Sequence, residues 1–312
     1  MGVYEVEIEQ PVFTMDDGHK IQATVYKPDS LPIGHIHLLH GMAEHQLRYK
    51  DFAQQLVEVG YLVSSHDHRG HGETAVLNNA IIGYYADKDG FERVVKDVHE
   101  VLTAIQQQNG QLRLTIFGHS MGSFIARRYA QRYSETLHNA IFCGTGATTP
   151  LHVIGHQLAK VLVKTNGAKT PSRIMNRLSF GSFNKGIPNV LTNFDWICSD
   201  ENVVQKYIED THCGFIATNQ FFVDLTGGLM TINKQAEIDK IRKDLPVLFI
   251  AGGDDPVGEK GKGVYKVAEQ LKAAQMTDVT VSLFEGMRHE ILNEKNKQHV
   301  YDVVLRWLKK YE

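Results

Sequence analysis

Short apolar runs that alternate with amphipathic stretches constrain the fold of this chain more than any other feature. The runs are His35–His40, Tyr61–Asp67, Leu112–Phe117, Ala140–Cys143, Pro246–Ala251 and Val279–Phe284. Stretches with helical spacing of apolar residues cover Leu47–Val59, Gly90–Gln108, Ser123–Tyr133, Gly263–Ala274 and Lys295–Lys310. Strands that alternate with helices need crossover connections, so the sequence predicts an α/β fold with a mostly parallel central sheet flanked by helices.

The N-terminal segment follows a different pattern. Polar and apolar residues alternate in Val3–Glu9, and again in Ile21–Tyr26 after a turn signal at Asp16–Gly18. This pattern predicts an antiparallel hairpin at one edge of the sheet.

A block near the middle of the chain interrupts the alternation of strands and helices. Between residues 148 and 229 no strand pattern is found, and Leu151, Ile154, Leu158 and Leu162 lie at helical spacing. The simplest interpretation is a helical cap of residues 148–229 inserted into a core domain of residues 1–147 and 230–312. The apolar stripe would pack the cap onto the sheet or line an acyl tunnel, and packing is the commoner use.

Composition limits the partners and the location of the protein. Hydrophobic residues make up 42% of the chain and the net charge is −3, so it can bury a core and offers no basic field to nucleic acid. No run approaches the roughly 20 apolar residues of a membrane-spanning helix, and MGVYEVEIEQ has no secretory-signal pattern. Three cysteines without CxxC spacing fit a reducing compartment. A cytoplasmic protein without integral membrane association is expected.

The strongest chemical signal is Gly118-His119-Ser120-Met121-Gly122, a G-x-S-x-G motif. It follows an apolar run and opens a helical pattern, which is the context of the nucleophile elbow in the α/β-hydrolase fold. A serine on such a sharp turn needs small neighbours two residues away, and the helix N-terminus lies beneath the developing oxyanion. The motif alone is weak, because a Gly/Ser turn occurs in many α/β proteins, but its position predicts Ser120 as a nucleophile.

A serine nucleophile needs a base that is oriented by an acid, and in this fold the chain order is Ser, Asp or Glu, then His. The run Pro246–Ala251 leads into Asp254 and Asp255, and the run Val279–Phe284 leads into His289. Both follow the ends of predicted strands, where sites in α/β sheets form. We therefore predict His289 as the base and Asp255 as the acid, with Asp254 as the competing turn residue.

Two backbone N–H groups are needed to hold the oxyanion. Met121 follows the nucleophile directly, and Met42 lies in the loop after His35–His40, so their amides are the predicted donors. The segment His66–Gly72 holds three histidines and an aspartate, which are also metal ligands. No second ligand cluster pairs with it, so a structural loop is favoured and neither metal nor cofactor is expected.

These segments together resemble the monoacylglycerol lipase and lysophospholipase group of α/β-hydrolases, particularly bacterial members. The resemblance is carried by His40–His45 with Arg48-Tyr49, Asp67–Gly72, Gly118–Gly122, Phe194–Trp196, Asp254–Val257 and Arg288–Glu290, and it spans nearly the whole chain. It implies Ser120, Asp255 and His289 as a triad, the Met42 and Met121 amides as the oxyanion hole, and no cofactor. Some members have a small residue where Met42 stands, so a narrowed acyl pocket is expected.

The resulting prediction is a serine hydrolase that cleaves carboxylic esters of lipid-like substrates through an acyl-enzyme, with a monoacylglycerol or a lysophospholipid as substrate. An amidase, aminopeptidase-like or thioester hydrolase on the same triad is the alternative. An aminopeptidase would need a cap carboxylate for the substrate ammonium, and the candidates are Asp195, Asp200, Glu201, Glu209 and Asp210. A non-catalytic ligand-binding protein is a further alternative. The sequence leaves a homo-oligomer open.

Overall fold

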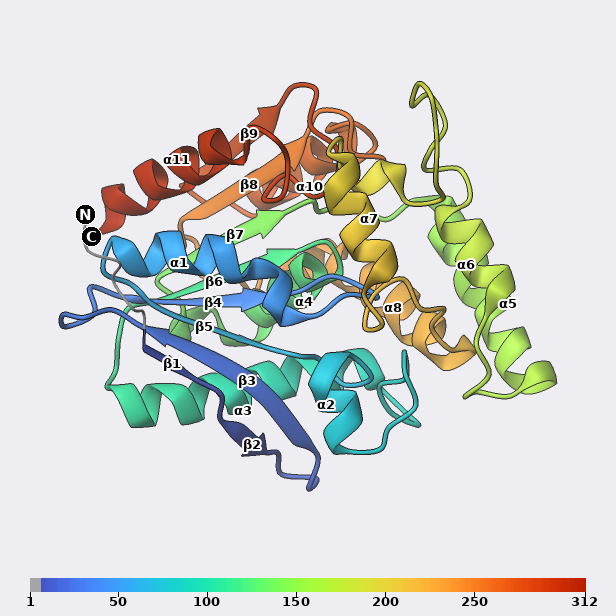
Figure 1. Ribbon diagram of the computed structural model, residues 1–312, viewed down its shortest axis with the longest axis horizontal. Helices are drawn as coiled ribbons and strands as arrows, with labels where there is room; N and C mark the ends of the chain where they lie inside the picture. The colour runs from blue at the N-terminus through green and yellow to red at the C-terminus, as the bar shows by residue number, and fades with distance from the viewer. Residues whose placement is uncertain (1–6) are drawn as a thin grey trace.

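The computed structural model describes residues 7–312 and has a twisted nine-stranded sheet at its centre (Figure 1). The strand order is β1-β3-β5-β4-β6-β7-β8-β9, with β2 paired to β3 outside this path. The strands are β1 Glu7–Glu9, β2 Val12–Thr14, β3 Lys20–Lys27, β4 His35–Leu39, β5 Leu62–His66, β6 Leu114–His119, β7 Asn139–Cys143, β8 Val247–Gly252 and β9 Val279–Phe284. All pairs from β5 to β9 are parallel, so the predicted α/β-hydrolase sheet is confirmed.

The N-terminal hairpin differs from the prediction in its pairing. The turn at Asp16–Gly18 joins β3 to β2, whereas the alternating segment that suggested the hairpin forms β1 and pairs with β3 further along. Pro11 separates β1 from β2, because proline cannot donate to a strand ladder. Residues 3–6 of the predicted first strand lie outside the described part of the chain.

Helices cover both faces of the sheet (Figure 1). On one face, α1 (Lys50–Glu58) and α11 (Lys297–Leu308) bury their apolar sides against β4, β6, β7 and β8. On the other, α3 (Gly90–Asn109), α4 (Met121–Tyr133) and α10 (Lys262–Ala273) do the same. Within residues 7–312, no helix combines the length and the apolar character needed to cross a membrane.

The chain between β7 and β8 is helical and gathers at one end of the sheet (Figure 1). Its helices are α5 (Pro150–Asn166), α6 (Arg173–Phe180), α7 (Glu201–Glu209) and α8 (Asn219–Ile232), and the short α9 (Gln235–Ile238) follows. On α5, Leu162 is buried, whereas Leu151 and Ile154 are exposed. The first two residues of the apolar stripe therefore neither pack onto the sheet nor line a tunnel.

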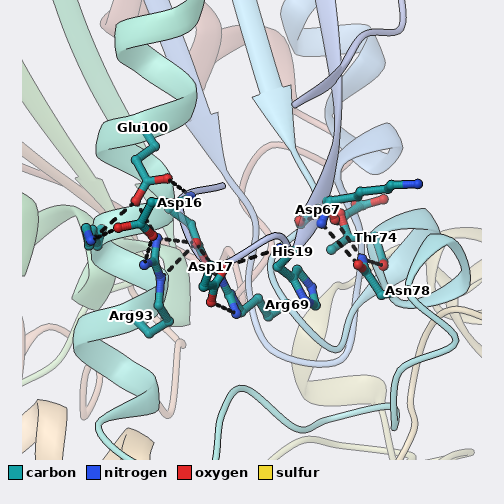
Figure 2. Close-up of polar contacts among 12 residues, drawn as sticks. Asp16, Asp17, His19, Asp67, Arg69, Thr74, Asn78, Arg93 and Glu100 are labelled. Atoms are coloured by element: carbon teal, nitrogen blue, oxygen red, sulfur yellow. Dashed lines mark hydrogen bonds and ion pairs between the residues drawn. The ribbon is translucent and has the colours of Figure 1, made fainter. Parts of the chain in front are cut away.

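A polar cluster fixes the β2–β3 turn to the body of the molecule (Figure 2). Arg69 lies 2.8 Å from Asp17 and 2.6 Å from the buried Asp97 on α3. Arg93 binds Asp16 at 2.5 Å and Glu100 at 2.6 Å. These ion pairs join the hairpin, α3 and the loop after β5. That loop leads into α2 (Gly72–Leu77), a helix that the sequence analysis did not predict.

Candidate active site

Ser120 lies on a strained turn between β6 and α4. Its backbone has φ 54° and ψ −122°, and positive φ is unfavourable for a residue with a Cβ. The turn is tight because a Cβ on Gly118 would lie 2.2 Å from the Gly122 carbonyl oxygen, and one on Gly122 would lie 2.2 Å from the Leu39 carbonyl oxygen. Only glycine fits at either position, and the strain is held by packing between β6, α4 and the end of β4.

His289 and Asp255 form a buried pair behind this turn. The Nδ1 atom of His289 lies 2.9 Å from Oδ2 of Asp255, which is fully buried. The second oxygen of Asp255 accepts the Val257 amide at 2.8 Å, so the carboxylate cannot rotate freely. The His289 ring also packs against Trp196, with the ring centroids 5.1 Å apart. The Asp255 carboxylate thus fixes the orientation of the His289 imidazole. Because this contact uses Nδ1, the Nε2 atom on the other side of the ring is not bonded to Asp255.

Asp254, the competing acid, has different surroundings. Its side chain is 52% exposed and lies 3.6 Å from Nζ of Lys260, an exposed pairing with little energetic weight. Geometry therefore favours Asp255 over Asp254 as the partner of the histidine.

The two predicted oxyanion donors are Met121, directly after Ser120, and Met42, directly after Gly41, where an added Cβ would lie 3.1 Å from the Ser120 Cβ. Neither the Met42 N–H nor the Met121 N–H has a hydrogen-bond acceptor within residues 7–312. The Met121 side chain is buried, and its sulfur accepts the Tyr85 hydroxyl at 2.8 Å. Met42 follows β4, with its side chain on the cavity wall. Both amides are thus available to an oxygen that develops negative charge.

Beneath the candidate site, a network of buried charged groups links the β4 loop to the loop that carries His289. Arg48 donates to Glu44 at 2.7 Å and binds Glu290 through two bonds of 2.6 and 2.7 Å. Glu44 also accepts the Gly41 amide at 2.5 Å and the Tyr49 hydroxyl at 2.7 Å. Gly41 precedes Met42, and Glu290 follows His289. The network therefore holds the loop of Met42 and the loop of His289 in fixed positions relative to each other.

His119 extends this network to the elbow. Its Nδ1 lies 3.3 Å from Glu44, and its Nε2 lies 3.2 Å from the His289 carbonyl oxygen. Burial alone would lower the pKa of His119, but the Glu44 carboxylate raises it above its ordinary value. Burial would likewise raise the pKa of Glu44, but His119 and Arg48 hold it well below its usual range. The Glu44 carboxylate therefore favours the protonated form of the His119 ring, whose centroid lies 4.7 Å from that of the His289 ring.

Ser120, His289 and Met42 all line one cavity of about 510 Å³. This volume is typical of small-molecule sites, which span about 300–1,000 Å³. The aromatic and aliphatic lining consists of Phe180, Phe194, Trp196, Ile197, Tyr207, Phe215 and Ile216. Polar groups from the helical segment complete the wall, namely Asn176, Arg177, Asn184 and Asn193. The cavity lining therefore combines these aromatic and aliphatic side chains, its apolar compartment, with polar groups from the helical segment.

Sequence reasoning assigned no role to Glu44, Arg48, Tyr49, His119 or Glu290. Glu44, Arg48, Tyr49 and Glu290 belong to the segments that carry the family resemblance, but no role was predicted for them. His119 occupies one of the two variable positions of the G-x-S-x-G motif. The missing signal is spatial: Arg48 and Glu290 are 242 residues apart in the chain, so no local pattern joins them.

The histidine-rich segment after β5 has the structural role that was favoured. Asp67 accepts the amides of Gln46 at 2.8 Å and Glu73 at 2.9 Å, and a Cβ on Gly72 would meet its carboxylate at 2.3 Å. Cys143 is fully buried at the end of β7, and its carbonyl accepts the Ser120 amide at 2.9 Å. It packs as a small apolar residue, and burial raises the pKa of its thiol well above the usual range.

A strained serine between strand and helix, a His–Asp pair after later strands and a mostly parallel sheet define an α/β-hydrolase. Residues 31–296 match the Hydrolase_4 family, described as Serine aminopeptidase, S33. The match covers most of the chain, which therefore belongs to this family.

Individual relatives confirm the resemblance found in the sequence. A monoacylglycerol lipase of Mycolicibacterium smegmatis is 25% identical over 296 residues, which cover 93% of each chain. A thermostable carboxyl esterase from Bacillus coagulans, solved with glycerol, is 28% identical with a TM-score of 0.91, and the match covers 97% of this chain and 98% of that one. A lipase in its open form is also 28% identical, with a TM-score of 0.86 and coverage of 98% and 99%.

Proposed function

We propose that this protein hydrolyses carboxylic esters of lipid-like substrates, with monoacylglycerols as the substrate class. The carrying observation is the cavity in which Ser120, the Asp255-bonded His289 and the Met42 loop meet an aromatic wall. An acyl chain matches the apolar compartment, and a glycerol head group matches the amide side chains of the lining. The names of the relatives, a monoacylglycerol lipase and a carboxyl esterase, support the same reaction.

The proposed mechanism uses each residue in one role. His289 takes the proton of the Ser120 hydroxyl through Nε2 as the oxygen attacks the ester carbonyl, and Asp255 stabilises the resulting imidazolium. The oxyanion accepts the N–H groups of Met42 and Met121. His289 then gives its proton to the leaving alcohol, and a water activated by the same histidine releases the acid. No metal or cofactor takes part in these steps.

We further propose that residues 148–229 act as a cap over a core of residues 1–147 and 230–312. Cavity residues come from both parts: Ser120 and His289 from the core, and Phe180 and Phe194 from the helical segment. Helix α8 crosses the proposed boundary and ends at Ile232. A cytoplasmic location is in keeping with the three unpaired thiols Cys143, Cys198 and Cys213.

The carboxylates of the helical segment weigh against aminopeptidase activity. Asp195 accepts the Leu191 and Thr192 amides, Asp200 caps α7, and Asp210 binds His45. None of the five cap acids that were candidates for an ammonium site lines the cavity. The carboxylates that do line it, Glu44 and Glu290, both already bind Arg48. A free amino group would therefore find no unpaired carboxylate beside the serine.

The decisive experiment compares initial rates on glycerol monoesters from acetyl to oleoyl, a lysophospholipid and an aminoacyl arylamide. We expect the monoesters to be cleaved fastest and the arylamide not at all. Ser120→Ala is expected to lower kcat by at least about 10⁴-fold while the fold is retained. Arylamide cleavage without ester cleavage would overturn the ester assignment, and full activity of Ser120→Ala would overturn the nucleophile. Tight ligand retention with negligible turnover would instead indicate a binding protein.

A further inference from the structure

Outside the cavity, His45, Asp210 and Cys213 bring three ligand atoms within 4.8 Å of one another. Within residues 7–312 no other group of three His, Cys, Asp or Glu side chains does so. The Nε2 atom of His45 lies 2.8 Å from Oδ2 of Asp210, while the Cys213 thiol forms no disulfide. The three residues come from the loop after β4 and the turn after α7, which are distant in sequence.

We propose that this cluster is a binding site for a thiophilic divalent cation, with Zn²⁺ the best match. Imidazole nitrogen, thiolate sulfur and carboxylate oxygen are the three protein donors that zinc uses, whereas Mg²⁺ and Ca²⁺ require oxygen ligands alone. Three protein ligands leave a fourth tetrahedral position for water. Coordination converts the Cys213 thiol to a thiolate and releases its proton to solvent.

The distances are compatible with this ion. With bonds of about 2.0–2.3 Å, tetrahedral zinc ligands lie about 3.3–3.8 Å apart. His45 and Asp210, now hydrogen-bonded, would separate by about half an ångström, which a small side-chain rotation supplies. Their side chains are 12% and 31% exposed, so an ion can enter from solvent on their side.

The surrounding charges favour a cation. Burial raises the pKa of the Cys213 thiol, the carboxylates of Glu44, Asp210 and Glu290 raise it further, and the guanidinium of Arg48 lowers it. Arg48 is already engaged by two of these carboxylates. A bound divalent ion would therefore neutralise an excess of negative charge.

The position of the site suggests what a bound ion would do. The Ala43 carbonyl accepts the Gly214 amide and the Tyr207 hydroxyl, each at 2.9 Å, so the turn after α7 already rests on the β4 loop. Zinc would add a coordinate link between the same two segments. Because Met42 precedes Ala43, the ion would clamp the predicted oxyanion loop to the helical segment.

Cobalt titration provides a direct test that does not depend on activity. We expect Co²⁺ added to the metal-free protein to produce a thiolate-to-cobalt charge-transfer band that Zn²⁺ displaces. Cys213→Ser should abolish the band, and His45→Gln should weaken Zn²⁺ binding by at least about tenfold. Cys198→Ser is the matched control, because Cys198 is also buried but donates to the Asn293 carbonyl.

A second measurement separates this site from adventitious binding. Zn²⁺ should raise the Tm of the wild type and of Cys198→Ser but not of Cys213→Ser. Asp210→Asn, at a more exposed residue, gives the same comparison should Cys213→Ser fail to fold. Equal zinc affinity in wild type, Cys213→Ser and Asp210→Asn, or the absence of any cobalt band, would refute the proposal. Neither result depends on the reaction at Ser120, so the proposed function stands or fails separately.

Discussion

Mild acidification should destabilise this protein strongly, because burial lowers the pKa of six of its buried histidines. They are His35, His37, His40, His66, His68 and His71, each no more than 1% exposed. Burial lowers the pKa of His35 and His66 to about 3 and that of His71 to about 4. Burial also lowers the pKa values of His37, His40 and His68 well below their ordinary range. Burial therefore favours the neutral form of all six in the native state.

The sign of the effect follows from proton uptake. In the unfolded chain these histidines protonate near pH 6.5, while the native state does not, so their stabilising contribution is complete above pH 6.5 and is lost as the pH falls. Between pH 7.5 and 5.5 each histidine lowers the free energy of unfolding by about 1.4 kcal/mol, and the six together by about 8 kcal/mol.

Buried groups with a raised pKa oppose this loss, namely Asp224, Asp67, Asp97 and His119. Burial raises the pKa of Asp224 to about 7, so the native state binds its proton before the unfolded chain does. Over the same pH range this stabilises the native state by about 2 kcal/mol. Taken over the six histidines and Asp224 alone, the expected loss is about 6 kcal/mol, which is comparable with the whole stability of many domains, about 5–15 kcal/mol.

Urea unfolding followed by circular dichroism at pH 7.5, 6.5 and 5.5 measures this loss. His68→Leu isolates one contribution, because neither ring nitrogen of His68 has a hydrogen-bond partner in the described chain. The variant should be as stable as the wild type at pH 7.5, or more so, and should lose about 1.4 kcal/mol less by pH 5.5. His299→Leu, at an exposed histidine, should leave the pH dependence unchanged.

The reasoning fails if the wild type loses less than about 2 kcal/mol between pH 7.5 and 5.5. It also fails if His68→Leu and wild type show the same pH slope. Either result would mean that the buried histidines protonate without unfolding.

Three further predictions concern the candidate site and its support. Asp255→Asn should lower kcat about 10⁴-fold with little change in KM, as measured by steady-state ester hydrolysis, and a smaller loss than tenfold would contradict its role. Gly122→Ala should lower the free energy of unfolding by at least about 3 kcal/mol, because the added Cβ would meet the Leu39 carbonyl oxygen. Gly155→Ala on α5 should raise it by about 0.5–1 kcal/mol. Urea unfolding measures both. Arg48→Met should destabilise by about 3–5 kcal/mol by leaving two buried carboxylates unpaired, while Arg132→Met on the surface should change stability by under about 1 kcal/mol.

Local patterns were enough to predict most of the sheet and the elbow. The β-branched run Val279–Phe284 is β9 with the same bounds, and the apolar run before the G-x-S-x-G motif forms β6. The first succeeds because β-branched and apolar residues are enriched in strands, and the second because a nucleophile elbow requires glycines at fixed spacing after a buried strand. The segments around Asp255 and His289 were found for the same reason, since each directly follows a recognisable strand.

What the sequence did not reveal depends on contacts between distant segments. The strand β2 is three residues long, too short for a periodic pattern to emerge beside Pro11. The cluster of His45, Asp210 and Cys213 combines residues 165 positions apart with no ligand spacing along the chain. Helix α2 begins at Gly72, a poor helix former, and its position is fixed by the Asp67 carboxylate.

The burial of α8 defines which part of the helical segment is exchangeable. Phe221 and Phe222 are at most 1% exposed and belong to the same apolar cluster as residues of α3 and α4. Helix α8 is therefore part of the hydrophobic core on this face of the sheet. Helices α6 and α7 lack such anchorage in that cluster apart from Met175. A chimera that transplants a relative's residues between Gly167 and Thr218 should therefore fold and carry a new substrate profile, whereas one that also replaces α8, or α5 with its buried Ala159 and Leu162, should not fold. Natural selection for new substrates can likewise change the residues of α6 and α7. The nucleophile elbow at Ser120 is unaffected, because it lies outside these helices.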